Sequence, residues 1–307
     1  MNIIGVDIGG SHILSAVINT DTFSILEQTR AVVEVKHTGT VDQIMSEWSK
    51  ALNKTLRASP SHIEGIGFAM PGPFDYRKGV GLFDGTNEKF CMLKNKKIDK
   101  ELKGYLIEPN LEMRFLNDAT SFAVGVSWFG ESKNCDRSIA ITLGTGFGSA
   151  YIENGYPVVN RENLAPQGCF WHLPFKEGIA DDYFSTRWFV NEYEKLRGTS
   201  IAGVKEIAEE AANDKDVLSL FDQFGKNLGQ FFIPWLQKFP AEMIVMGGNI
   251  SAAYNRFGPA LEDELIRHGI ETRPVVSELK EDAALIGSAR LFDETFWNVI
   301  KHDLPAI

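Results

Sequence analysis

The sequence predicts an α/β protein made of two similar halves, and two observations carry the prediction. The segments IIGVDIGGSHILSAVI (residues 3–18) and AITLGTGFGSAYI (residues 140–152) share one pattern, a strand, a glycine turn and a returning strand. An internal repeat of this kind determines the architecture of a fold. The length of 307 residues also gives each half enough chain for a hydrophobic core.

The first half alternates expected strands with expected helices. Strands are expected at 3–6, 12–19, 24–35, 63–70 and 113–116. From Thr40 to Ala58 the apolar residues recur at the spacing of an amphipathic helix, and Thr40 with Gln43 is typical of a capping box. A second helix is expected at 119–129, directly after the pair Asn117-Asp118.

The second half is expected to be mostly helical. It has strands at 138–143, 149–153 and 243–246, whereas helical spacing covers 181–197, 204–213, 216–239 and about 282–300. Pro234 should kink or shorten its helix because proline lacks a backbone N–H. Ser251 is placed to cap the helix that follows the third strand.

Composition disfavours several classes of function. Asp and Glu number 41 against 31 Lys and Arg, a net charge of −10, so neither nucleic acid nor an anionic membrane surface is an expected partner. The N-terminus lacks the pattern of a signal peptide, and no apolar run approaches the ~18 residues of a transmembrane helix. The three scattered cysteines, Cys91, Cys135 and Cys169, favour a reducing cytoplasm and offer no CxxC pair for zinc.

The two glycine turns are candidate phosphate-binding loops. Asp7, Gly9, Gly10 and Ser11 follow the first strand, and Gly144-Thr145-Gly146 holds the matching place in the second half. Glycine lets backbone N–H groups approach an anion, and Asp7 could hold Mg²⁺ through water. Either turn alone is equally well explained as a plain hairpin. The pair is more specific, because two such turns could grip one polyphosphate from both sides.

Other candidate residues have a structural explanation beside the functional one. Asp118 could be a general base, or it could cap the helix that follows. Gly247-Gly248-Asn249 suits a nucleotide base or ribose, but also a simple strand-to-helix turn. His172 lies in an aromatic segment, where a lone histidine is more often a core residue than a ligand. Asp181-Asp182 opens a helix, where carboxylates offset the helix dipole.

Taken together, these motifs resemble the ROK family of sugar kinases and repressors, within the actin-like ATPase superfamily. Residues 7–11 resemble its DxGGT motif, 70–75 its PGPVD, 117–119 its NDA, 143–148 its LGTGVG, 245–251 its LGGGIS, and 282–289 its closing helix. The motifs occur in the family's order and span nearly the whole chain.

The resemblance implies two ribonuclease-H-like lobes with a cleft between them for ATP, Mg²⁺ and a sugar. Residues 1–118 with 283–307 would form the sugar and phosphate side, and 119–282 the nucleotide side. Asp118 would be the catalytic base. The sugar contacts would be Asn87, Asn117, Asp118, His172 and Asp181. The nucleotide contacts would be Asp7, Gly9, Gly10, Ser11, Gly144, Thr145, Gly146, Gly247, Gly248 and Asn249. Closure of the lobes would exclude water.

The chain departs from the family pattern around the sugar. The family's zinc loop, CxCGxxGCxE, is absent, so no zinc site is expected. Cys169 stands where the family has a sugar-binding Glu, and Asp181 falls at the position of a later one. His12 stands where a Lys follows the family's GGT. The phosphoryl machinery is thus kept, and the groups that orient the sugar are changed.

Our interpretation is a cytoplasmic, ATP-dependent sugar kinase acting on a hexose or N-acylated hexosamine. The alternative is a sugar-binding sensor with weak or no catalysis, motivated by Cys169. Since the first strand starts at Ile3, we expect no DNA-binding domain before it, which disfavours the repressor class. The oligomeric state is left open, a homodimer included.

Overall fold

The computed structural model describes residues 1–22, 24–85 and 89–305, and the chain divides into two compact units. Unit 1 comprises Met1–Phe129 and Glu281–Ile307, and unit 2 comprises Gly130–Lys280. The first boundary therefore lies after helix α3 (Asp118–Trp128), not before it at 118/119 as the sequence analysis placed it. The reason is packing, because α3 lies against α9 (Asp282–Ala289) within unit 1.

Unit 1 is built on a five-stranded sheet of order β3-β2-β1-β4-β7. Its strands are β1 (Asn2–Ile8), β2 (His12–Asn19), β3 (Ser24–Glu34), β4 (Gly65–Met70) and β7 (Glu112–Asn117). The first three pair antiparallel, while β1, β4 and β7 run parallel. Because β1, β4 and β7 run parallel, their carboxyl ends share one edge of the sheet. Asp7 and Asn117 both lie at that edge.

Helices cover both faces of this sheet. Helix α1 (Val41–Ala58) packs on β2 and β3, and its predicted capping box of Thr40 and Gln43 is present. The expected helix at 282–300 is two helices, α9 and α10 (Glu294–Ile300), because Asp293 between them caps α10. The smaller elements are α2 (Ile98–Lys103), β5 (Phe74–Asp75), β6 (Val80–Gly81) and 3-10 turns at Cys91–Leu93 and Arg290–Phe292.

Helix α9 lies unusually close to the sheet, and two glycines permit it. A Cβ on Gly5 of β1 would lie 2.3 Å from the Leu285 carbonyl oxygen, and one on Gly67 of β4 would lie 2.0 Å from the Ser288 carbonyl oxygen. No real Cβ tolerates such distances. The helix backbone therefore rests directly on the strand that carries Asp7.

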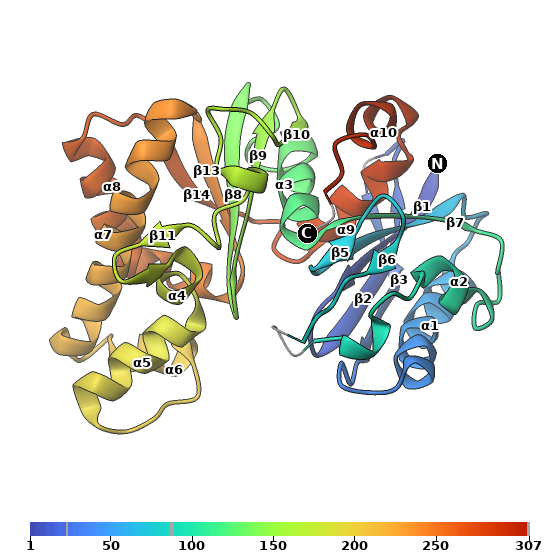
Figure 1. Ribbon diagram of the computed structural model, residues 1–307, viewed down its shortest axis with the longest axis horizontal. Coiled ribbons are helices and arrows are strands. Elements are labelled where there is room, and N and C mark those ends of the chain that lie inside the picture. Colours follow the sequence, from blue (N-terminus) through green and yellow to red (C-terminus); the bar gives the residue numbers. More distant parts are fainter. Residues whose placement is uncertain (23, 86–88, 306–307) are drawn as a thin grey trace. The chain divides into compact units, whose positions relative to one another are not determined.

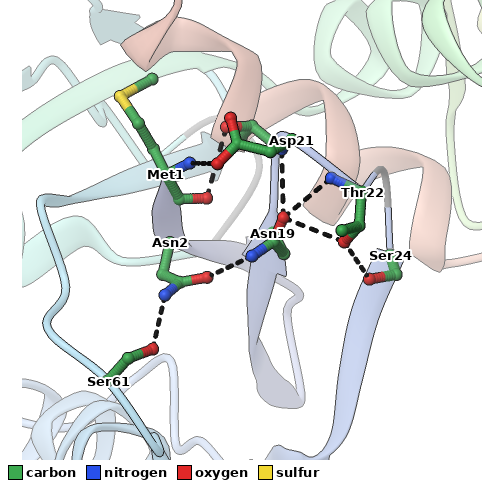
Figure 2. A network of polar contacts seen from close by, with 8 residues as sticks. Met1, Asn2, Asn19, Asp21, Thr22, Ser24 and Ser61 are labelled. Atoms are coloured by element: carbon green, nitrogen blue, oxygen red, sulfur yellow. Dashed lines mark hydrogen bonds and ion pairs between the residues drawn. The ribbon is translucent and has the colours of Figure 1, made fainter.

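A polar network closes the opposite end of the β1–β2 hairpin. The Asn19 side chain donates to Asn2 Oδ1 at 2.9 Å, and its own oxygen accepts from the backbone N–H of Thr22 at 2.8 Å. Asn2 continues the network to Ser61, as Figure 2 shows. These contacts fix the hairpin's register far along the strands from Asp7.

Unit 2 repeats the topology of unit 1. Its sheet has the order β10-β9-β8-β13-β14, with antiparallel pairing of the first three strands and parallel pairing of the last three (Figure 1). The strands are β8 (Arg137–Leu143), β9 (Phe147–Glu153), β10 (Tyr156–Val158), β13 (Met243–Gly247) and β14 (Arg273–Val276). The predicted internal repeat is confirmed.

The helices of unit 2 differ in detail from the expectation. The segment 181–197 forms two helices, α4 (Ala180–Tyr183) and α5 (Thr186–Arg197). Pro234 lies inside α7 (Lys215–Lys238), which continues past the proline. Ser251 caps no helix, because it lies in a 3-10 turn and its Oγ donates to the Gly248 carbonyl at 2.6 Å. The remaining elements are α6 (Val204–Glu210), α7 (Lys215–Lys238), α8 (Tyr254–Arg267), β11 (Pro174–Phe175), β12 (Gly178–Ile179) and 3-10 turns at Pro166–Gly168 and Asn249–Ala253.

Each unit has its own hydrophobic core, and that of unit 2 is rich in aromatic rings. Phe147, at the start of β9, packs edge-on against Phe184 with ring centroids 5.2 Å apart.

Within the described ranges, no helix has both the length and the apolar content to cross a membrane.

Candidate active site

Two carboxylates lie at the carboxyl edge of the unit 1 sheet. Asp7 is near the end of β1, and Asp118 is the first residue of α3, directly after β7. Burial raises the pKa of Asp7 to about 7, and the negative charges of Asp118 and Glu281 add to the shift. Such crowding of carboxylates favours a cation in their company.

Asn117, not Asp118, is the N-cap of α3. Its side-chain oxygen accepts from the Thr120 backbone N–H at 3.1 Å, and its nitrogen donates to Asp118 Oδ1 at 2.9 Å. The same nitrogen donates to the Tyr76 hydroxyl at 3.1 Å. The capping explanation that competed with catalysis for Asp118 therefore belongs to its neighbour.

The environment of Asp118 is mixed. Burial raises its pKa, whereas the Ala119 backbone N–H, the positive charge of Lys89 and the Asn117 amide oppose that rise. Asp118 Oδ1 accepts hydrogen bonds from the Asn117 side-chain nitrogen at 2.9 Å and from the Ala119 backbone N–H at 2.8 Å.

Lys89 is a residue of this site that the sequence analysis missed. A Cβ on Gly10 would lie 3.0 Å from Lys89 Cε and 3.4 Å from its Nζ, so the lysine side chain lies over the first glycine turn. A lone lysine carries no motif, and only its position two residues after Asn87 could have drawn attention to it. Asn87 itself lies outside the described residues.

The first glycine turn is a tight hairpin. The Gly9 N–H donates to the His12 carbonyl at 2.9 Å, and Ser11 is exposed with its Oγ 3.2 Å from His12 Nδ1. Gly10 is part of this hairpin and lies beside the Lys89 side chain. Unit 1 thus gathers Asp7, Gly10, Lys89 and Asp118 at one edge.

The second glycine turn lies at the equivalent edge of the unit 2 sheet. Thr145 and Gly146 form its exposed tip. Gly248, which has a φ of 82°, lies directly beside it, because a Cβ there would be 2.3 Å from the Leu143 carbonyl oxygen. The structure therefore brings together the turn Gly144-Thr145-Gly146 and the turn Gly247-Gly248-Asn249. Both leave bare backbone where a nucleotide could approach.

Cys169 and His172 are neighbours in unit 2. Cys169 Sγ lies 3.8 Å from His172 Nδ1. Burial raises the pKa of the Cys169 thiol to about 11 and lowers that of His172. A neutral thiol is a poor hydrogen-bonding group, so the side chain at this position cannot act as a carboxylate would.

Asp181 is engaged within unit 2. Its Oδ1 accepts from the Phe147 backbone N–H at 2.7 Å, and its Oδ2 accepts from Arg187 Nη2 at 2.8 Å. Thr186 reaches the same turn through the Gly144 carbonyl. Neither Thr186 nor Arg187 had a sequence signal, because their roles depend on how α4 and α5 pack.

Comparisons with known proteins show which family the chain resembles. A model of the ROK family matches residues 3–295. The chain is 26% identical to a glucokinase of Thermotoga maritima, over 96% of this chain and 98% of that protein. It is 24% identical to an N-acetyl-D-glucosamine kinase of Haemophilus influenzae, over 94% of this chain and 98% of that one.

A solved structure shows the same fold. A ROK family glucokinase from Streptomyces griseus, in complex with glucose and AMPPNP, matches with a TM-score of 0.76 at 21% identity, covering 96% of this chain and all 100% of that one. The family match runs from the strand that carries Asp7 into the helix that follows α9, and so includes every motif described above. The chain belongs to the ROK family.

Proposed function

We propose that this protein is an ATP-dependent sugar kinase that phosphorylates a hydroxyl of a hexose or an N-acylhexosamine. The observation that carries the proposal is the position of Asp118, which starts α3 beside Asp7 while Asn117 does the capping. The named activities of the relatives, glucokinase and N-acetyl-D-glucosamine kinase, support the same class of reaction.

In this reaction Asp118 takes the proton of the sugar hydroxyl. The hydroxyl oxygen forms a bond to the γ-phosphorus as the bond to the β,γ-bridging oxygen breaks, and ADP leaves. Phosphoryl transfer depends mainly on alignment and charge stabilisation, so Asp118 is one contributor among several. Asn117 orients it through the hydrogen bond of 2.9 Å.

The backbone of the two glycine turns would hold the phosphates. The candidate donors are the N–H groups near Gly9 and Gly10 in unit 1 and those near Gly144 and Gly146 in unit 2. The bare backbone at Gly248 suits the nucleoside. In this proposal unit 1 is the sugar and phosphate side, and unit 2 the nucleotide side.

The residues around Asp7 fit a magnesium ion. Mg²⁺ prefers carboxylate and water oxygens. Burial first, and then the negative charges of Asp118 and Glu281, raise the pKa of Asp7 to about 7, and a cation would offset those charges. Asp7 would hold the ion through water. Bound Mg²⁺ supplies positive charge to the phosphates.

Among the described residues, the proposed sugar contacts are Asn117, Asp118 and His172, whereas Asn87 lies outside that range. With Cys169 in place of a carboxylate, one hydrogen-bond acceptor for sugar hydroxyls is missing, which favours a substituted or N-acylated sugar over plain glucose. The acidic, cysteine-poor composition is consistent with a cytoplasmic enzyme.

The test is ATP consumption with glucose, N-acetylglucosamine and N-acetylmannosamine, beside thermal shifts with the same sugars. Turnover with any of them supports the kinase. A thermal shift without turnover supports a second candidate function, a sugar-binding sensor, which the neutral thiol of Cys169 favours. If no sugar of a wider panel gave turnover or a thermal shift, both candidate functions would be refuted.

A further inference from the structure

The start of helix α5 is bonded to the first residue of the unit 2 glycine turn. Thr186 donates twice to the Gly144 carbonyl, from its backbone N–H at 2.8 Å and from its Oγ1 at 3.0 Å. Two donors on one carbonyl fix the direction of that peptide group. The Gly144 carbonyl therefore points toward α5.

This contact also orients the next N–H. In a planar trans peptide, the carbonyl of one residue and the N–H of the next point in opposite directions. With the Gly144 carbonyl held toward α5, the Thr145 N–H points away from the helix, at the exposed tip of the turn. An anion site needs N–H groups facing outward in this way.

Asp181 holds the other end of the same turn. Its Oδ1 accepts from the Phe147 N–H at 2.7 Å, and a Cβ on Gly146 would lie only 3.1 Å from that oxygen. Its Oδ2 is paired with Arg187, and its backbone N–H donates to the Trp171 carbonyl at 3.0 Å. Each carboxylate oxygen thus accepts a hydrogen bond from a group of unit 2.

We propose that Asp181 and Thr186 are positioning residues that fix the glycine turn 144–146 for the phosphates of a nucleotide, and that Asp181 does not bind the sugar. The proposal rests on the kinase function proposed above. It reassigns Asp181, which the family resemblance placed among the sugar contacts.

The test compares Asp181→Ala with Asp182→Ala. Asp182 is the adjacent carboxylate, and it accepts from the Ile179 N–H at 3.0 Å without contacting the turn. Titration calorimetry would measure ADP with Mg²⁺, and separately glucose and N-acetylglucosamine, and kinetics would give KM for ATP and for the sugar. Asp181→Ala should weaken ADP binding about tenfold, the effect of losing one hydrogen bond to a charged group. Sugar affinity should not change.

Two further variants exclude a general loss of structure. Asp181→Asn keeps an acceptor for the Phe147 N–H and should restore much of the ADP affinity. Thr186→Val keeps the backbone donor and should raise KM for ATP more than it changes KM for the sugar. Asp182→Ala should leave the ADP affinity at the wild-type value.

The outcomes separate this inference from the proposed function. A weaker sugar affinity in Asp181→Ala, with unchanged ADP affinity, would overturn the inference and leave the kinase intact. Equal loss of ADP affinity in Asp182→Ala would also overturn it. Wild-type protein that binds no ADP would overturn both.

Discussion

Asn117 donates a hydrogen bond to Asp118 Oδ1 over 2.9 Å and, through its own oxygen, caps the helix that Asp118 begins. One side chain thus secures the helix and orients the proposed base. The two adjacent residues have separable duties, which makes them a matched pair for mutation.

Asp118→Asn should reduce kcat about 10²–10⁴-fold, the usual contribution of a general base. The melting temperature should hardly fall, because the cap is on Asn117. Sugar binding by calorimetry should persist. An active variant that melts at a lower temperature would show that Asp118 has only a structural duty.

Asn117→Ala is expected to behave differently. Loss of an N-cap costs about 1 kcal/mol, so denaturant unfolding should show a clear loss of stability. Activity should fall as well, since Asp118 loses its orienting donor. An unchanged free energy of unfolding would contradict the capping geometry.

Lys89→Met should move the acid limb of the kcat/KM profile to higher pH. The charge of Lys89 lowers the pKa of Asp118 against the effect of burial, so its removal lets that pKa rise further, and the base is then protonated at a higher pH. Lys89→Arg should keep the wild-type profile, and so should Lys100→Met on the exposed side of α2. If the acid side of the profile does not move in Lys89→Met, the charge of Lys89 does not act on the catalytic base.

Asp7→Asn should abolish turnover and yet stabilise the metal-free protein above pH 7. The pKa of Asp7 is about 7 in the fold, against its ordinary value of 3.8. Between these values the folded state binds more protons, so stability falls as pH rises. Each pKa unit corresponds to about 1.4 kcal/mol, and because Asp7 keeps some contact with solvent we expect a gain of about 1–2 kcal/mol at pH 8. Below about pH 4 the two proteins should unfold alike.

Cys169→Glu should improve the use of glucose. The carboxylate would accept hydrogen bonds that a thiol with a pKa of about 11 cannot. The measurement is kcat/KM for glucose against N-acetylglucosamine. If the wild type already uses glucose efficiently and the substitution changes nothing, the argument about the pocket fails.

The repeated strand–turn–strand units were predictable because they depend on local patterns. Glycine at a turn and apolar strands on either side leave few alternatives, so β1–β2 and β8–β9 follow directly. The capping box at Thr40 and Gln43 is equally local. Asp7 and Asp118 were linked beforehand only by the family resemblance, and the structure accounts for their proximity through parallel strands that end at one edge of the sheet.

Other features depend on contacts distant in sequence, which no pattern encodes. The break between α4 and α5 places Asp181 and Thr186 on the glycine turn. Lys89 lies over Gly10, far from it along the chain. Asp293 caps α10 and so separates it from the helix before it, which is a local cause. The apolar residues keep their helical spacing on both sides of Asp293, and for that reason the sequence predicted a single helix.

The close fit of α9 on Gly5 and Gly67 has a consequence for biosynthesis. The ribosome makes β1 and β4 first, yet the helix that covers them emerges only after residues 130–280. Unit 2 is continuous in the chain. Because domains generally fold as units, unit 2 should be folded before α9, which unit 1 needs, has been synthesised. A chain arrested at Lys280 should therefore protect the amides of β8 and β13 from hydrogen exchange and leave those of β1 and β4 exposed. Equal protection of both sheets in that chain would refute this order. If the predicted order holds, one of the last segments of the chain to be synthesised covers the sheet that was synthesised first.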